Sequence, residues 1–258
     1  MASTREAMIV RVCQRAALAQ AGPVLGAAAE AESVEAVSAA GFEAVLTDPD
    51  LPSGSDRVWA ALQAFAPAGH HDVVINLQGD MPPIDPEALS ALMPLLQNGA
   101  DIATLAAEIT HEAERNDPNV VKIALAANNR ALYFSRATIP HGDGPLLHHV
   151  GVYGYTRDAL QRFVSLPPSP LEKRESLEQL RALEAGMRID CAILNGEPPN
   201  GVDTPADLDA ARYWYHERGL ARPNPEKSSP IRASAVQTPI LLGRTSSPTS
   251  KPCLAGPL

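Results

Sequence analysis

The sequence predicts an α/β fold in which helices flank a mostly parallel β-sheet. Apolar segments alternate with helical patterns from Met8 to about His216, as they do in chains built from successive βα units. Residues 73–77 are almost continuously apolar, which is typical of a strand covered on both faces. The chain has 258 residues, of which 45% are hydrophobic, and this is enough for one sizeable domain.

Further strands and three helix starts can be placed along the chain. Additional strands are expected at residues 102–106, 120–125, 132–134, 150–155 and 189–194, whereas residues 22–26 make a poor strand. Asp85 and Pro86 open one helix, with proline at its first position, and Pro94 should end or kink it. Thr204 and Pro205 follow Asp203 at the start of the last helix.

The remaining helix start is the most clearly signalled. Residues 169–172 read Ser-Pro-Leu-Glu, a capping box with proline at the first helical position. Leu177, Leu180 and Leu183 then form an apolar stripe at three-residue spacing, and Gly186 closes the segment. We therefore expect one helix that runs from the capping box to this glycine.

The chain changes character near residue 222. Residues 222–258 hold seven prolines and six serines, and residues 240–242 are their one short apolar run. This composition predicts a disordered Pro/Ser-rich tail, 222–258, behind a single domain at 1–221.

Charge and cysteine usage exclude several classes of protein. The net charge is −9, and no dense cluster of Lys and Arg suggests a nucleic-acid partner. Cys13, Cys191 and Cys253 lack metal or disulfide spacing, so we expect reduced thiols in a cytoplasmic protein. The N-terminus has no signal-peptide pattern, and no apolar run reaches the ~20 residues that span a bilayer, so no membrane association is expected.

Two aspartates are candidates for a metal site. Residues 76–80 read Asn-Leu-Gln-Gly-Asp, and ligands of open α/β sheets bind beyond the carboxyl ends of strands. Asp80 is therefore placed to hold a hard cation such as Mg²⁺, although an ordinary strand-to-turn boundary explains the same residues equally well. Asp203 by itself is better explained as a helix cap, and becomes a second metal ligand if Asp80 lies close to it.

Other polar residues have both a functional and a structural explanation. Residues 51–57 form a loop whose backbone could hold a base or an anion, but a capped loop with a surface arginine is the simpler reading. His148 and His149 point to opposite faces of a strand, which argues against a zinc site and favours a structural or substrate-binding role. Lys122 and Arg136 could contact an anionic substrate or could be solvated.

Taken together, these segments resemble a known family. Residues 73–80 (Val-Val-Ile-Asn-Leu-Gln-Gly-Asp) and 201–205 (Gly-Val-Asp-Thr-Pro) match the CMP-KDO synthetases, the 3-deoxy-manno-octulosonate cytidylyltransferases. Residues 46–57, 121–123, 131–140, 149–155, 168–172 and 177–181 also match, in the family's order. The resemblance implies a Rossmann-like nucleotidyltransferase with a smaller dimerisation and sugar-binding region, acting as a homodimer in the bacterial cytoplasm.

The resemblance also implies a reaction and a set of site residues. CTP and KDO would give CMP-KDO and pyrophosphate, a step toward lipopolysaccharide, by in-line attack of the sugar's anomeric hydroxyl on the α-phosphate. Asp80 and Asp203 would hold Mg²⁺ as the catalytic pair. The nucleotide would be bound by Ser3, Arg5, Ser53, Gly54, Arg57 and Gln78. The sugar pocket would be lined by Arg136, His149, Tyr153, Glu178 and Gln179.

The front of the chain departs from the family pattern. The family's first strand and the Leu-Pro-Gly-Lys part of its phosphate loop are absent, and Ser3, Thr4 and Arg5 resemble a remnant of that loop. Residues 27–29 are Ala-Ala-Ala where the family has Ala-Thr-Asp, and Met81 replaces a common Glu. Two alternatives therefore remain: a degenerate paralogue that binds nucleotide without catalysis, and a truncated chain without turnover. The sequence also leaves open KDO, its 8-amino analogue or another 2-keto sugar acid as substrate.

Overall fold

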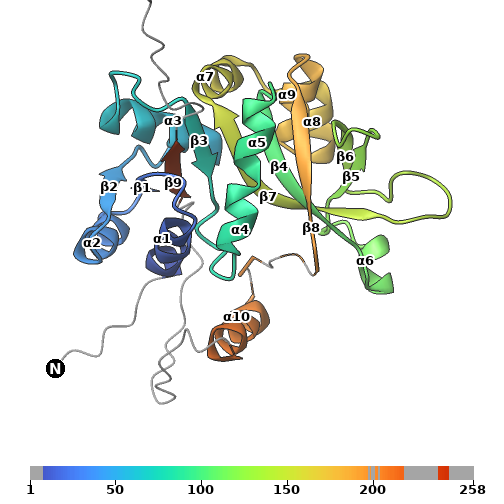
Figure 1. Cartoon of the computed structure of the whole chain (residues 1–258), viewed down its shortest axis with the longest axis horizontal. Coiled ribbons are helices and arrows are strands. Elements are labelled where there is room, and N and C mark those ends of the chain that lie inside the picture. The colour runs from blue at the N-terminus through green and yellow to red at the C-terminus, as the bar shows by residue number, and fades with distance from the viewer. Residues whose placement is uncertain (1–7, 197, 199–200, 203, 218–237, 244–258) are drawn as a thin grey trace, which may run out of the picture.

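The computed structural model describes residues 8–196, 198, 201–202, 204–217 and 238–243 (Figure 1). The strands are β1 (Val24–Ala28), β2 (Glu43–Leu46), β3 (Val73–Asn76), β4 (Ile102–Glu108), β5 (Lys122–Leu125), β6 (Ala131–Ser135), β7 (Leu147–Thr156), β8 (Ile189–Leu194) and β9 (Thr238–Gly243). The helices are α1 (Met8–Leu18), α2 (Ala31–Ala39), α3 (Gly54–Phe65), α4 (Pro86–Ser90), α5 (Leu92–Gln97), α6 (Glu112–Arg115), α7 (Arg157–Ser165), α8 (Pro170–Glu175), α9 (Gln179–Glu184) and α10 (Pro205–Glu217).

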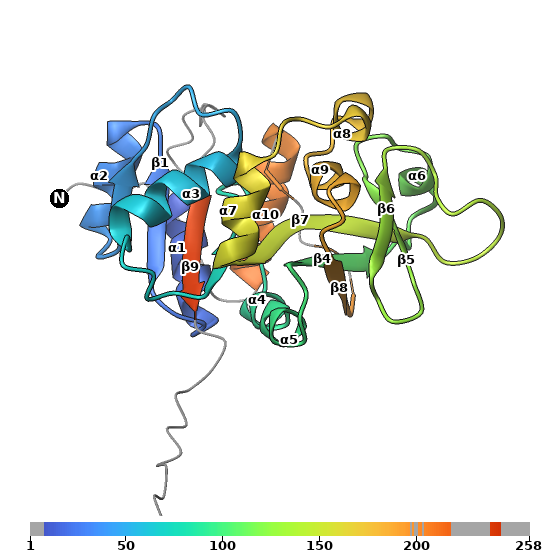
Figure 2. The same cartoon turned by 90° about the horizontal axis from the view of Figure 1, so that it is seen from above.

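The strands form one sheet in the order β2-β1-β9-β3-β7-β4-β8, and β5 joins it through β7 and carries β6. Strands β1, β2, β3, β4 and β8 run in one direction, whereas β7 and β9 run the opposite way and pair antiparallel with both neighbours. The predicted α/β class is therefore confirmed. The expected mostly parallel sheet is corrected, because among the described strands the β1–β2 and β4–β8 pairs are parallel and the other pairs are antiparallel. In Figure 2, β5, β6 and α6 gather at the end of the molecule remote from α2 and form a smaller region there.

Helices cover both faces of the sheet, as the apolar character of β3 requires. Val74 packs in one core cluster with residues of α3, α7 and α9, whereas Val73 and Ile75 pack in a second cluster with residues of α1, α4 and α5. Successive side chains of a strand point to opposite faces, so a strand between two helical layers must be apolar on both. The central strand thus holds the two layers together.

Strand β1 corrects the expectation that residues 22–26 make a poor strand. All five residues of Val24–Ala28 are buried, and β1 pairs parallel with β2. A Cβ atom added to Gly26 would lie 2.9 Å from Cγ1 of Val37 in α2. The glycine that weakens the local strand signal therefore allows the close approach of α2 to the sheet.

Strand β9 corrects the prediction of a disordered tail at residues 222–258. Residues 238–243 insert between β1 and β3, with Leu241 opposite both Val24 and Ile75 (Figure 1). Composition over 37 residues concealed a short strand because its apolar run is only a few residues long. The remaining residues of the predicted tail lie outside the described part of the chain.

One helix prediction is confirmed and another needs correction. The segment after Asp85 is divided at Ala91 into α4 and α5, three residues before Pro94, as expected where a proline ring interrupts a helical turn. The capping box forms as predicted, with Ser169 and Glu172 as its two members. However, Ser176 adopts a left-handed conformation with φ 55°, which ends α8 and separates it from α9. The leucine stripe therefore belongs to α9 and the turn before it.

Helix α10 starts where predicted. Thr204 and Asp207 cap it reciprocally, since the Thr204 amide donates to Asp207 Oδ2 (2.8 Å) and the Asp207 amide donates to Thr204 Oγ1 (3.2 Å). Cys13 and Cys191 are buried free thiols, and burial raises the pKa of each to about 12. Across the described residues, no helix combines the length and the apolar character that a membrane span requires.

Candidate active site

The loop after β3 forms one wall of the candidate site. Gln78 and Asp80 follow the carboxyl end of β3 and are half-buried, while Gly79 between them is buried. The backbone N–H of Val202 donates to the carbonyl oxygen of Asp80 (2.8 Å). Residues 80 and 202 are therefore held together although they lie far apart in the sequence. Asp203, the second predicted metal ligand, lies outside the described residues.

A cavity of about 290 Å³ opens beside this loop. It is lined by Gln78, Asn119, Val121, His148, His149, Gly151, Tyr153, Ser176, Leu177, Glu178 and Gln179. These residues come from the loop after β3, the segment before β5, strand β7, the turn before α9 and the first residue of α9. The structure thus brings together one residue predicted to contact the nucleotide and four of the five predicted to contact the sugar. Their roles toward a ligand stay predictions.

The loop before α3 is braced by its own side chains. Ser53 caps α3, because its Oγ accepts a hydrogen bond from the Asp56 amide (3.2 Å) and donates one to Asp56 Oδ2 (2.7 Å). Gly54 is the first residue of the helix. Arg57 is buried, and its Nη1 donates to Thr47 Oγ1 and to the Asp48 carbonyl. The simpler reading of a surface arginine is therefore wrong, since Arg57 fixes the segment between β2 and α3.

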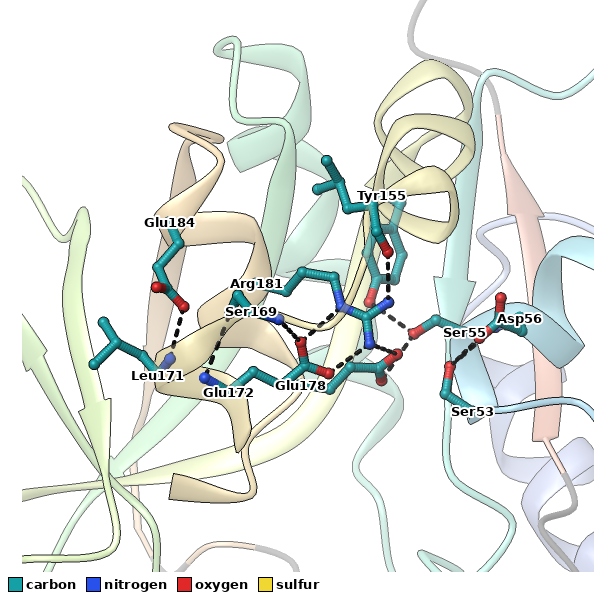
Figure 3. A network of polar contacts seen from close by, with 11 residues as sticks. Ser53, Ser55, Asp56, Tyr155, Ser169, Leu171, Glu172, Glu178, Arg181 and Glu184 are labelled. Carbon is teal, nitrogen blue, oxygen red and sulfur yellow. Dashed lines mark hydrogen bonds and ion pairs between the residues drawn. The ribbon is translucent and has the colours of Figure 1, made fainter. Parts of the chain in front are cut away.

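A polar network connects this loop with the cavity (Figure 3). Ser55 Oγ donates to Glu178 Oε2 (3.2 Å) and lies 3.4 Å from the Tyr155 hydroxyl. Arg181 donates from Nε to Glu172 Oε2 (2.8 Å) and from Nη2 to Glu172 Oε1 (2.5 Å), and Nη2 lies 4.0 Å from Glu178 Oε1. The capping box therefore also anchors Arg181, and Arg181 and Ser55 together hold Glu178 at the cavity wall.

The comparisons with known proteins agree with this geometry. A family model described as cytidylyltransferase matches residues 5–189. The 3-deoxy-manno-octulosonate cytidylyltransferase of Parvibaculum lavamentivorans is 60% identical over 218 residues, covering 83% of this chain and 84% of that relative. The chain belongs to the 3-deoxy-manno-octulosonate cytidylyltransferase family.

Further relatives of this cytidylyltransferase support the assignment. The enzyme of the same name from Rhodospirillum centenum is 57% identical over 222 residues, covering 84% of this chain and 86% of the relative. A solved structure of CMP:2-keto-3-deoxy-manno-octonic acid synthetase complexed with CTP matches with a TM-score of 0.76 at 36% identity. That match covers 82% of this chain and 88% of the solved one. The predicted Rossmann-like nucleotidyltransferase fold is confirmed.

Burial sets the protonation of the cavity wall of this cytidylyltransferase. Desolvation lowers the pKa of His149 to about 3, and desolvation raises the pKa of Tyr153 well above its ordinary value. Desolvation also raises the pKa of Glu178, opposed by the charge of Arg181 and by the hydrogen bond from Ser55. At neutral pH the wall therefore presents a neutral imidazole and a protonated phenol.

Two predicted cations have structural partners. Arg136 donates to the carbonyl oxygens of Glu175 (2.9 Å), Pro118 (3.0 Å) and Ser176 (3.3 Å), so it ties together segments around the cavity without lining it. Lys122 is fully buried and its Nζ donates to the Asp117 carbonyl (2.6 Å), which excludes the solvated alternative for this residue. Ser3 and Arg5 lie outside the described residues.

Sequence reasoning missed several residues of the site. Ser55 lies inside the segment 51–57, and a serine between Gly54 and Asp56 carries no distinct local pattern. Tyr155 and Arg181 fall at the ends of matched segments, at 149–155 and 177–181. A buried hydrogen bond across the fold could have been found only from coordinates.

Proposed function

We propose that this chain transfers CMP from CTP to KDO and releases pyrophosphate, as a step toward lipopolysaccharide. The oxygen of the sugar's anomeric hydroxyl bonds to the α-phosphorus, the bond from that phosphorus to the pyrophosphate oxygen breaks, and the proton of the hydroxyl passes to solvent. The observation that carries the proposal is a cavity beside the Asp80 loop that is lined by Gln78 together with His149, Tyr153, Glu178 and Gln179. Catalysis would follow from holding the two reactants in line.

The nucleotide would lie along the loops after β3 and before α3. Gln78 offers an amide at the cavity, and the start of α3 at Ser53 and Gly54 offers backbone N–H groups. Arg57 supports this wall from within, since its guanidinium holds the Thr47 side chain and the Asp48 carbonyl in place. Ser3 and Arg5 are proposed to contact the phosphates, by family motif alone.

Asp80 and Asp203 are proposed to hold Mg²⁺. The bond from the Val202 amide to the Asp80 carbonyl supports the pairing, because it brings the chain to within one residue of Asp203 beside Asp80. Among the described residues there is no cluster of three or more potential metal ligands, which fits an ion that takes one or two carboxylates and completes its shell with water and phosphate. When bound, the ion supplies positive charge that neutralises the phosphate oxygens.

The sugar acid would occupy the other side of the cavity. Glu178 presents a carboxylate that accepts hydrogen bonds from hydroxyl groups, and Tyr153 presents a phenol that donates one. Gln179 is 6% exposed and has both an amide donor and an acceptor. Arg136 is proposed to shape the pocket through the turn at Ser176, because its guanidinium binds the carbonyl of that residue.

A homodimer in the bacterial cytoplasm is proposed as the working form. Leu132 on β6 is 59% exposed and Ile193 on β8 is 47% exposed, and both strands belong to the part of the sheet remote from β2. Exposed large apolar side chains of this kind are suited to burial against a second copy. Light scattering coupled to gel filtration measures the mass directly, and a monomer at micromolar concentration would contradict the proposal.

Pyrophosphate release tests the proposed reaction. The full chain is incubated with CTP, KDO and Mg²⁺, and each component is omitted in turn. We expect release that requires all three components and is accompanied by CMP-KDO. CTP binding without any turnover would instead mark a nucleotide-binding protein that has lost catalysis, and would contradict the proposal. Parallel assays with the 8-amino analogue and with a sialic acid define the substrate class.

A further inference from the structure

Strand β7 contains a bulge next to the cavity. In its pairing with β4, Thr104 lies opposite Tyr153 and Leu105 lies opposite Val150, so Gly151 and Val152 have no partner on β4. Val152 also has no register partner on β3 or β5. The ladder between β4 and β7 is therefore irregular beside the cavity.

The side chain of Thr104 binds the Val152 carbonyl beside this bulge. Thr104 is fully buried on β4, and its hydroxyl donates to the Val152 carbonyl (2.9 Å), with the Val150 carbonyl at 3.4 Å. A hydroxyl has a single hydrogen to donate and two lone pairs. Two carbonyl oxygens compete for that hydrogen, so the remaining neighbour of Thr104 Oγ1 must act as the donor.

That neighbour is His149. Its Nε2 lies 2.9 Å from Thr104 Oγ1, and the residue is 6% exposed. Because the hydroxyl hydrogen points to Val152, Nε2 carries the hydrogen of this contact. Burial also keeps the imidazole neutral, since its pKa falls to about 3. In a neutral imidazole with hydrogen on Nε2, the other nitrogen has a free lone pair.

We infer that Thr104 is a positioning residue, which holds His149 as the Nε2–H tautomer so that Nδ1 accepts a hydrogen bond from a hydroxyl of the sugar acid. The inference rests on the proposed function for its ligand. His149 lines the cavity, and within the described part of the chain Nδ1 has no hydrogen-bond partner. A neutral acceptor selects a hydroxyl and disfavours the sugar's carboxylate at this position.

The tautomer can be measured without any ligand. Full-length protein labelled with ¹⁵N in its histidine rings gives two-bond ¹H–¹⁵N correlations that distinguish the two tautomers, and His149→Gln identifies the signal. We expect Nε2–H in the unmodified protein and in Thr104→Ser, which keeps the hydroxyl. In Thr104→Val we expect a shift to Nδ1–H, because a hydrogen on the buried Nε2 would be left without its acceptor.

Kinetics of the same variants give an independent readout. Thr104→Val should raise KM for KDO by about tenfold, because one hydrogen bond to the sugar acid is lost. Its kcat and its KM for CTP should stay within about twofold of the normal values. Thr104→Ser should restore the normal KM. Thermal unfolding confirms that both variants are folded, and a general loss of structure would raise both KM values together.

Two results would overturn the inference. One is an Nδ1–H tautomer in the unmodified protein, and the other is an unchanged Nε2–H tautomer in Thr104→Val. These outcomes do not depend on turnover, so they are distinct from failure of the proposed reaction. A chain that shows the expected tautomers but does not consume KDO would contradict the reaction and leave the role of Thr104 intact.

Discussion

Strand β9 makes a sharp prediction about stability. Leu241 lies at the middle of β9 and opposite Val24 on one side and Ile75 on the other, so Leu241→Pro places a proline inside the sheet. Proline removes the backbone N–H and clashes with its surroundings, at a cost of about 3 kcal/mol where a hydrogen bond is lost. For a domain of about 200 residues this corresponds to a fall in Tm of roughly 6–12 °C.

Thermal unfolding followed by far-UV circular dichroism measures this effect. Ser246→Pro is a matched control, because it adds the same residue three positions after the end of β9, and we expect it to change Tm by less than about 2 °C. Deletion of residues 238–258 should destabilise the protein more than Leu241→Pro. An unchanged Tm in Leu241→Pro would refute the placement of β9 between β1 and β3.

Three further predictions concern the site and its support. Asp80→Asn should lower kcat by at least about a hundredfold with an unchanged Tm, and near-normal Mg²⁺-dependent turnover would contradict the metal assignment. Burial raises the pKa of Glu178, so the folded state holds that proton more tightly, and stability should fall as pH rises from the ordinary value of 4.5 through the raised pKa. Glu178→Gln should abolish this pH dependence of the urea midpoint and raise KM for KDO. The same pH dependence in Glu178→Gln as in the unmodified protein would contradict the raised pKa. Arg181→Met should cost about 1.5–3 kcal/mol in urea unfolding, because it removes the hydrogen bonds that Arg181 donates to the half-buried Glu172 carboxylate, and adding Glu172→Gln should recover part of this loss. A loss below about 0.5 kcal/mol, as for an exposed pair, would be inconsistent with this burial.

Local patterns predicted many elements because their signals are short-range. The apolar run at 73–77, the capping box at Ser169 and the prolines at helix starts each act within a few residues. They do not specify how far an element continues. The helix after Ser169 is interrupted at Ser176, and a left-handed residue other than glycine has no reliable sequence signal.

Long-range packing explains what the sequence could not show. Strand β1 depends on the contact between Gly26 and Val37, and β9 depends on two strands that lie about 160 residues or more before it. The motif match predicted Gln78, His149, Tyr153 and Glu178 as site residues, and the structure places all four in the lining of one cavity. The same match could not reveal that Arg57 is buried or that Thr104 contacts His149, because both contacts join different elements of the fold.

The transfer of CMP to KDO is best tested by a single-turnover reaction with the protein in excess over CTP. With KDO and Mg²⁺ present, ³¹P NMR should show the three phosphate signals of CTP replaced by those of a CMP diester and pyrophosphate in equal amounts. The same mixture with Asp80→Asn should leave CTP intact. Persistence of CTP with the unmodified chain, or pyrophosphate formed without KDO, would contradict a cavity that joins nucleotide and sugar acid for this transfer.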